Sequence, residues 1–313
     1  MAVRLPELRP DRYRLIEPPR LLAHRAGHAW EQLVLPVRAS RAEVIYCPAN
    51  LAPVLTTRSV VVIHDVAALR HPESYSTAYV TYQRMMLPLL ARRARAVITV
   101  SEFSKGELVE VLEIGPDRVE VVPAGVDERF TPVVDPRPAQ AAYDLQRPYV
   151  LSLGTVSARK NLEVLGAVAR ALRERGIELV VAGSDRGYLR SGAVPVRRLG
   201  YVAESLLPAL YAGARALAMP SRYEGFGLPC LEAMACGVPV VCSRAGALPE
   251  TCGEAALMGD PSDPAAFAEA VVTAATDERV RTDLARAGTG RAAQFSWART
   301  AELTDRAIER VLG

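Results

Sequence analysis

The sequence lacks any uncharged apolar stretch of about 18 residues, the length that would cross a membrane. Its N-terminal segment has no apolar core of a secretory signal, so a cytoplasmic protein is expected. Charges of the two signs nearly cancel, with 38 lysines and arginines against 35 acidic residues, and this balance predicts no nucleic-acid partner. The five cysteines are odd in number and form no Cys-x-x-Cys pair, which argues against a zinc ribbon or a disulfide framework.

The 313 residues, half of them apolar, are enough for two domains. Short β-branched runs alternate with longer Ala-, Leu- and Arg-rich stretches, which is typical of parallel strands covered by helices. Strands are predicted at 43–47, 59–64, 96–100, 119–122, 149–153, 178–182, 196–199, 216–219 and 238–242. Helices are predicted near 75–94, 104–113, 161–175, 204–213, 229–236 and 264–275, followed by a C-terminal helix that contains Trp297.

Several prolines between Phe130 and Pro148 interrupt any regular element, so this stretch is interpreted as an interdomain linker. The expected division is an N-terminal domain at 1–135, a C-terminal domain at 136–296 and a final helix at 297–313. Before Trp30 the sequence is charged and contains proline, and only Arg14 to Glu17 is compatible with a short strand.

The most informative segment runs from Met219 to Cys242, where a predicted strand leads into a glycine-containing loop and a helix opened by Pro229. A helix N-terminus offers unpaired N–H groups and the positive end of the helix dipole, which suits a diphosphate. Gly225 and Gly227 would let the backbone approach that diphosphate closely.

Two glutamates flank this loop. Glu224 lies in the loop and Glu232 in the first part of the helix, so each could accept hydrogen bonds from hydroxyl groups on either side of a diphosphate. The alternative interpretation is a generic strand-loop-helix turn with solvated glutamates.

A second segment places two cations just before a helix. Gly154 opens a loop after a predicted strand, and Arg159 and Lys160 follow. They could stabilise negative charge on a leaving diphosphate. A basic helix start is the alternative, and it would be electrostatically unfavourable at that position.

In the N-terminal half, His64 closes the apolar run Val60 to Asp65, at the strand end where open α/β sheets build their sites. A satisfied core histidine is the alternative. Ile98 to Lys105 and Val121 to Asp127 follow in order, and Val181 to Ser184 and Leu199 to Val202 form two further strand ends in the C-terminal half.

These segments, in this order from Trp30 to Trp297, resemble glycosyltransferase family 4, whose Glu-x7-Glu motif matches EGFGLPCLE at Glu224 to Glu232. The resemblance implies an α/β fold of two Rossmann-like domains facing a cleft, the GT-B type, with the C-terminal helix crossing back toward the N-terminal domain. It implies that Glu224 contacts the transferred sugar, Glu232 holds the nucleotide ribose and His64 faces the donor sugar. The implied site comprises Glu224, Lys160, Arg159 and His64 as catalytic residues; Gly154, Val202, Ser221, Gly225, Phe226, Gly227, Leu228 and Glu232 as donor-binding residues; and Ser101 and Lys105 on the acceptor side.

The implied reaction is the retaining transfer of a hexose from a nucleotide diphosphate sugar to a saccharide or lipid-linked acceptor. The RKN sequence of the cation pair favours a GDP-mannose-like donor and polysaccharide assembly. No Asp-x-Asp motif is present, so neither a metal nor another cofactor is expected.

The chain departs from the family pattern at its start, where a strand, a glycine-rich loop and a helix are expected and are not found before Trp30. A degenerate, non-catalytic nucleotide-sugar or carbohydrate binding protein is therefore the main alternative. An epimerase or phosphorylase of the same architecture is a weaker one, because their landmarks are not found. The segment Arg84 to Arg95 could contact an anionic membrane surface or be a buried helix with a basic solvated end.

Overall fold

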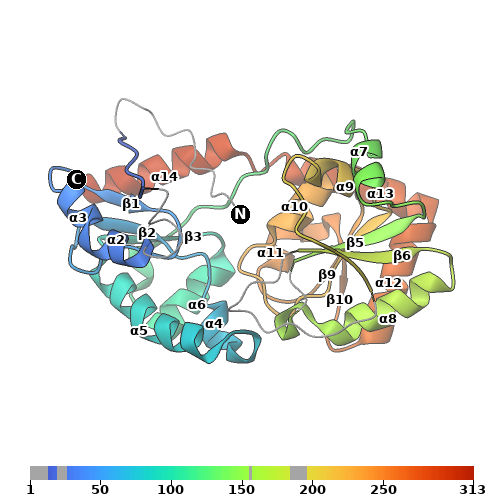
Figure 1. Ribbon diagram of the computed structural model, residues 1–313, viewed down its shortest axis with the longest axis horizontal. Coiled ribbons are helices and arrows are strands. Elements are labelled where there is room, and N and C mark those ends of the chain that lie inside the picture. Colours follow the sequence, from blue (N-terminus) through green and yellow to red (C-terminus); the bar gives the residue numbers. More distant parts are fainter. Residues whose placement is uncertain (1–12, 20–26, 155–156, 184–195) are drawn as a thin grey trace.

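The computed structural model describes residues 13–19, 27–154, 157–183 and 196–313, which form two lobes side by side (Figure 1). The N-terminal lobe contains a parallel sheet in the order β1-β2-β3-β4. Its strands are β1 (Ile45–Cys47), β2 (Ser59–Val62), β3 (Ala96–Thr99) and β4 (Val119–Val121). Every residue of the central strands β2 and β3 is buried, because helices cover both faces of a parallel sheet.

The C-terminal lobe contains a six-stranded parallel sheet in the order β10-β9-β8-β5-β6-β7. Its strands are β5 (Tyr149–Leu153), β6 (Glu178–Ala182), β7 (Arg197–Gly200), β8 (Ala216–Met219), β9 (Val240–Ser243) and β10 (Leu257–Gly259). The strand order reverses between β5 and β8, which are hydrogen-bonded neighbours. Open α/β sheets bind ligands beyond the carboxyl ends of the strands at such a switch point. The loops that follow β5 and β8 are the two motif segments of the C-terminal half.

The helices of the N-terminal lobe are α2 (Gly27–Leu33), α3 (Leu35–Arg38), α4 (Ala67–Arg70), α5 (Thr77–Arg93) and α6 (Glu102–Leu112). Trp30 of α2 and Leu87 of α5 are buried in one apolar cluster with strands β1 to β4. Serine is the N-cap of the two longest of these helices. The Ser76 side chain accepts from Tyr79 N at the start of α5, and the Ser101 side chain accepts from Ser104 N at the start of α6.

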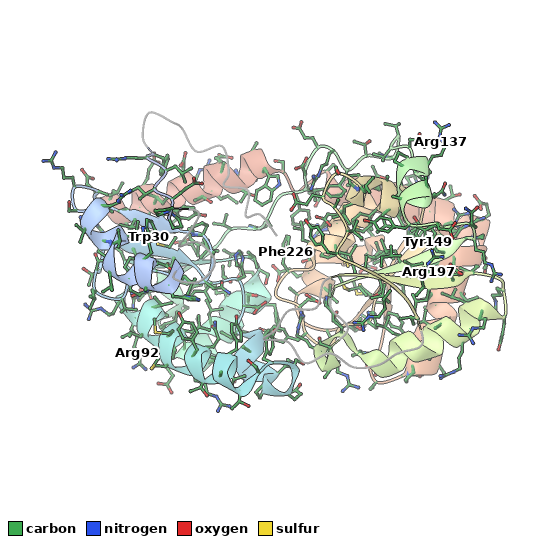
Figure 2. The ribbon with its side chains drawn as sticks, viewed as in Figure 1. Trp30, Arg92, Arg137, Tyr149, Arg197 and Phe226 are labelled. Carbon is green, nitrogen blue, oxygen red and sulfur yellow. The ribbon has the colours of Figure 1, made fainter. Side chains whose placement is uncertain are left out.

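The helices of the C-terminal lobe are α7 (Arg137–Ala142), α8 (Leu162–Arg173), α9 (Leu207–Ala212), α10 (Leu228–Ala235), α11 (Leu248–Cys252), α12 (Pro264–Thr276) and α13 (Glu278–Ala292). Helices α8 and α12 pack on one face of the sheet around Phe267, which is fully buried. Helices α9 and α10 pack on the other face around Tyr149 and Tyr211. Figure 2 places Tyr149 within this lobe and Phe226 where the lobe faces its neighbour.

The last helix, α14 (Trp297–Leu312), returns to the N-terminal lobe, as predicted (Figure 1). Ala307 and Ile308 pack in one cluster with β2 and β3. At the crossing point the Thr300 hydroxyl donates to the Pro123 carbonyl at 2.7 Å. A Cβ on Gly125 would lie 2.2 Å from the backbone nitrogen of Trp297, so only glycine allows this approach.

All nine predicted strands are present, and three of them, 149–153, 178–182 and 216–219, have the predicted ends. The short strand predicted at Arg14 to Glu17 is wrong, since that segment forms no ladder. The prediction that residues 130–148 contain no regular element is also wrong, because α7 forms there. Pro136 is the N-cap of α7 and Pro138 lies in its first turn, where no intrahelical N–H is required.

Candidate functional site

A buried ion cluster lies at the switch point of the C-terminal sheet. Lys160 Nζ lies 2.6 Å from Glu224 Oε1, and an Arg159 guanidinium nitrogen lies 3.0 Å from the same oxygen. Lys160 and Arg159 follow β5, and Glu224 lies in the loop between β8 and α10 (residues 220–227). The two motif segments thus meet at one carboxylate, although they are 64 residues apart in the chain.

This cluster holds its charges in spite of burial. Burial alone would raise the pKa of Glu224, but the charges of Arg159 and Lys160 outweigh it and lower that pKa to about 2. Burial lowers the pKa of Lys160, and the Glu224 carboxylate opposes that shift. Burial also acts against the charge of Arg159, but Glu224 keeps its pKa above the usual value. Two cations therefore share one carboxylate, which suits the cluster to receive further negative charge.

The glycines of the β8–α10 loop serve close approach between protein segments. A Cβ on Gly225 would lie 2.9 Å from the His64 carbonyl and 2.7 Å from Asp65 Cβ. Gly225 therefore lets the loop touch the N-terminal lobe. Gly227, at φ +102°, is the N-cap of α10 in the left-handed region that favours glycine, and a Cβ there would also clash with Leu248.

Glu232, on α10, lies apart from the ion cluster. Its Oε2 atom accepts a hydrogen bond from the Tyr211 hydroxyl at 2.7 Å. Burial raises the pKa of Glu232 to about 7, although the Tyr211 hydrogen bond and the charge of Arg129 act in the opposite direction. The two glutamates of the motif thus have different environments: Glu224 is ion-paired and stays ionised, whereas Glu232 changes its protonation state near pH 7.

His64 follows β2 at its carboxyl end and is held by the loop after β1. Its backbone N–H donates to the Asn50 side-chain oxygen at 2.8 Å, and its Nε2 atom lies 3.1 Å from the Pro48 carbonyl. Because a carbonyl can only accept, Nε2 carries the proton. Burial lowers the pKa of His64, with Asp65 acting against this shift, so the ring is neutral and Nδ1 is its acceptor.

Helix α6 of the N-terminal lobe binds the C-terminal lobe directly. The Ser101 and Ser104 hydroxyls donate to the Gly225 carbonyl at 2.7 and 2.9 Å. The backbone N–H groups of Glu102 and Phe103 donate to the Glu250 carboxylate at 2.9 and 3.0 Å. We call these five residues with Gly225 the α6 latch. Ser101 was predicted on the acceptor side, and the structure places its hydroxyl against the β8–α10 loop.

Tyr223 adds an apolar contact between the lobes. Its ring is buried in a cluster with Ala67, Ala68 and Tyr75 of the N-terminal lobe. The rings of His71 and Phe103 meet it edge to face, each at a centroid distance of 5.3 Å. Since Tyr223 directly precedes Glu224, this contact ties the ion cluster to the position of the N-terminal lobe.

The other predicted residues are placed as follows. Gly154, at φ +121°, packs against the side chain of Lys160, where a Cβ would lie 2.9 Å from Lys160 Cε. Ser221 is fully buried and helps to lower the pKa of Glu224. Lys105 is half-buried on α6 and forms no ion pair with any residue that the structure describes. Phe226, Leu228 and Val202 belong to the apolar cluster around α10, and Ser184 lies outside the described residues.

Several residues of this region were not predicted. They are Asn50, which holds His64; Asp65, whose charge acts on Arg159; Tyr211, which binds Glu232; and Ser104 and Glu250 of the α6 latch. For Asn50 the sequence offers only a turn signal, because asparagine is enriched at positive φ and adopts φ +55° here, and a turn does not predict the contact with His64. The other contacts join distant parts of the chain and leave no local pattern.

Within the described ranges, no cluster of three or more His, Cys, Asp or Glu side chains could hold a metal ion. No helix among them is long and apolar enough to span a bilayer. In the segment 84–95, Leu87 and Leu90 are buried while Arg92 and Arg93 are exposed, which matches a buried helix with a basic solvated end. Figure 2 shows Arg92 at the rim of the N-terminal lobe.

Known proteins share both the sequence and the fold. The model of Glycosyltransferase Family 4 matches residues 6–130, and that of Glycosyl transferases group 1 matches residues 147–277. Among solved structures, a sucrose-phosphate synthase from Thermosynechococcus elongatus superposes with a TM-score of 0.73 at 24% identity, over 96% of this chain and 82% of that one. Anabaena HepE in complex with UDP and glucose gives a TM-score of 0.72 at 19% identity, over 88% of this chain and 80% of that one.

Among curated relatives, the O-antigen chain mannosyltransferase B of Escherichia coli is 33% identical over 305 residues, which cover 90% of this chain and 77% of that protein. The serotype-specific mannosyltransferase WbdA of Escherichia coli is 29% identical over 297 residues, and the match spans 87% of this chain but only 36% of WbdA. The extent and identity of the first match show the family. The chain belongs to glycosyltransferase family 4 and is a glycosyltransferase of the GT-B fold.

Proposed function

We propose that the chain transfers a hexose, with retention of configuration, from a GDP-mannose-like nucleotide sugar to a hydroxyl of a saccharide or lipid-linked acceptor. The observation that carries the proposal is the buried cluster in which Lys160 and Arg159 share the Glu224 carboxylate. It lies at the switch point of the nucleotide-binding type of sheet, in contact through Gly225 with the His64 carbonyl.

The proposed chemistry uses the positive excess of this cluster. When the bond from the sugar to the diphosphate breaks, negative charge grows on the phosphate oxygens. Lys160 and Arg159 can bind these oxygens, and the Glu224 carboxylate is then free to accept hydrogen bonds from the sugar hydroxyls. Because these charges are already in place, little reorganisation is needed at the moment of reaction.

A same-face mechanism fits the described carboxylates near this cluster. Glu224 is paired with two cations, and Asp65 Oδ1 accepts the backbone N–H of Ala67 at 2.9 Å. The pairing of Glu224 with two cations argues against its attack on the anomeric carbon, which is the role of the nucleophile in a retaining glycosidase. We infer that the departing phosphate takes the proton of the acceptor hydroxyl, and that no metal or other cofactor takes part.

The relatives support mannose as the transferred sugar. The E. coli proteins that match most of this chain are named as O-antigen and serotype-specific mannosyltransferases. HepE is named as a complex with UDP, so the fold alone does not decide the base. If the acceptor is linked to a lipid, the exposed arginines of α5 would meet the anionic surface of a membrane.

The proposal is tested with GDP-mannose labelled with ¹³C at the anomeric carbon, with methyl α-mannoside and a polyprenyl-linked saccharide as acceptors. The expected product keeps the α configuration, read from its one-bond C–H coupling. Free GDP and an α-linked product support the proposal, and a β-linked product contradicts retention. Tight binding of GDP-mannose without release of GDP would instead favour the non-catalytic binding protein.

A further inference from the structure

The Tyr211–Glu232 contact is built into the core of the C-terminal lobe. Tyr211 is fully buried at the end of α9, and its hydroxyl donates to Glu232 Oε2 at 2.7 Å. Its ring meets that of Phe130 edge to face at 5.8 Å between centroids. Phe130 is itself buried, in the segment that leaves the N-terminal lobe. The tyrosine therefore has one fixed orientation.

Only one of the two carboxylate oxygens is used in this contact. Glu232 Oε1 makes no hydrogen bond to any residue in the described part of the chain, and it is not sealed from solvent. A carboxylate with one oxygen held by a rigid donor and the other open is ready to accept bonds from a pair of neighbouring hydroxyl groups.

We propose that Tyr211 is a positioning residue of the nucleotide site, which holds Glu232 so that its open oxygen accepts hydrogen bonds from the ribose hydroxyls of a nucleoside diphosphate. The inference rests on the proposed function. Tyr211 acts through Glu232 and does not touch the ligand. Its hydroxyl also favours the ionised form of Glu232, which burial opposes.

The charged surroundings of Glu232 agree with a need for such a donor. Arg129 favours the ionised form of Glu232, while Asp127 and Glu204 disfavour it. The charge of Glu232 in turn helps to raise the pKa of Cys236, the C-cap residue of α10. Tyr211 is the hydrogen-bond donor among them. Removing its hydroxyl should therefore raise the pKa of Glu232 and weaken its bonds to ribose hydroxyls together.

The test compares nucleotides with and without the ribose hydroxyls. Dissociation constants of GDP, UDP and ADP, and of their 2′,3′-dideoxy forms, are measured by calorimetry between pH 5.5 and 8.5 for the wild type, Tyr211→Phe and Glu232→Gln. In Tyr211→Phe we expect affinity for the preferred nucleotide to fall about tenfold near pH 7. Affinity for its dideoxy form should be unchanged, and the pH at which ribose-dependent affinity is half lost should move upward.

Tyr149→Phe is the matched control. Tyr149 is equally buried in the same apolar cluster, and its hydroxyl donates to the Leu210 carbonyl at 2.6 Å. This variant should lose stability in a similar way without changing the ratio of affinities for the ribose and dideoxy nucleotides. An equal loss for both nucleotides in Tyr211→Phe would overturn the proposal, because a purely structural role predicts that result.

Failure of the proposed function has a different signature. A wild type that binds none of the nucleotides contradicts the proposed function and the ribose as ligand. The carboxyl ¹³C resonance of Glu232 then still decides the role of Tyr211: an upward shift of its titration in Tyr211→Phe supports the role, and an unchanged titration overturns it. A wild type that binds a nucleotide and its dideoxy form equally contradicts the ribose contact.

Discussion

At the residue scale, position 160 of this site requires lysine and does not accept arginine. The sequence holds 38 lysines and arginines, and only two of them, Lys105 and Lys160, are lysines. Arginine thus serves at nearly every other cationic position of the chain. Lys160 keeps a compact ammonium group where Gly154 packs against its side chain and Glu224 lies 2.6 Å from its nitrogen. A planar guanidinium of larger size cannot take the same place.

Lys160→Ala and Lys160→Arg should therefore both lose activity. We expect the rate of sugar transfer or donor hydrolysis to fall by about 10²- to 10³-fold in Lys160→Ala, the loss typical of one removed electrostatic donor. Release of the nucleotide from GDP-mannose gives the measurement. Arg137→Ala, which removes an exposed arginine of α7, is the control and should keep the wild-type rate. A Lys160→Ala enzyme of normal rate would remove this residue from the mechanism.

Glu232 should make stability depend on pH. Its pKa is raised from 4.5 to about 7 in the folded protein, so between these values the folded state binds more protons than the unfolded state. The free energy of unfolding of the wild type, relative to Glu232→Gln, should fall as pH rises through this window, by at most about 3 kcal/mol. Urea unfolding from pH 4 to pH 8 gives the measurement. Glu254→Gln, which removes an exposed carboxylate, is the control, and parallel curves for wild type and Glu232→Gln would disprove the shift.

At the scale of elements, the site depends on how α6 meets the C-terminal lobe. Two hydroxyls of one helix turn bind the Gly225 carbonyl, and two backbone N–H groups of that turn bind the Glu250 carboxylate. A carboxylate at a helix N-terminus is favoured by unpaired donors and by the helix dipole. The α6 latch therefore fixes the β8–α10 loop, and with it Glu224, against the N-terminal lobe.

Loss of the α6 latch should separate the lobes and weaken donor binding. We expect Ser104→Ala combined with Glu250→Ala to raise the radius of gyration in small-angle scattering and to lower donor affinity about tenfold or more. Ser76→Ala is the control, since it removes a helix cap in the N-terminal lobe outside the latch. If the double variant keeps both the wild-type dimension and the affinity, the latch does not hold the lobes together.

Local patterns predicted those elements whose sequence already carries the signal. The β-branched runs at 149–153 and 178–182 became β5 and β6, and the Glu-x7-Glu segment became the loop and helix that hold Glu224 and Glu232. Strand β10 was missed because it is short, at the sheet edge, and ends in a glycine. The contact of Ser101 with Gly225 joins residues 124 positions apart, and Ser101 by itself suggests only a helix cap. Such contacts follow from how the lobes meet, which no local pattern encodes.

At the scale of the whole molecule, the two lobes meet where Gly225 of the β8–α10 loop contacts His64 after β2, and α14 joins the lobes at a second contact, between Thr300 and Pro123. We propose that the ion cluster and Glu232 form one nucleotide-sugar site within this arrangement. A ligand that binds only the folded protein raises its stability, by about 2.7 kcal/mol at one hundred times the dissociation constant.

The thermal midpoint with GDP, UDP and ADP, each alone and as the sugar conjugate, tests that claim most directly. We predict a clear rise of the thermal midpoint with one nucleotide family, GDP in the first place, and loss of that rise in Lys160→Ala and Glu232→Ala. A cooperative melt that no nucleotide shifts, or a shift that survives both substitutions, would contradict the assignment of this site.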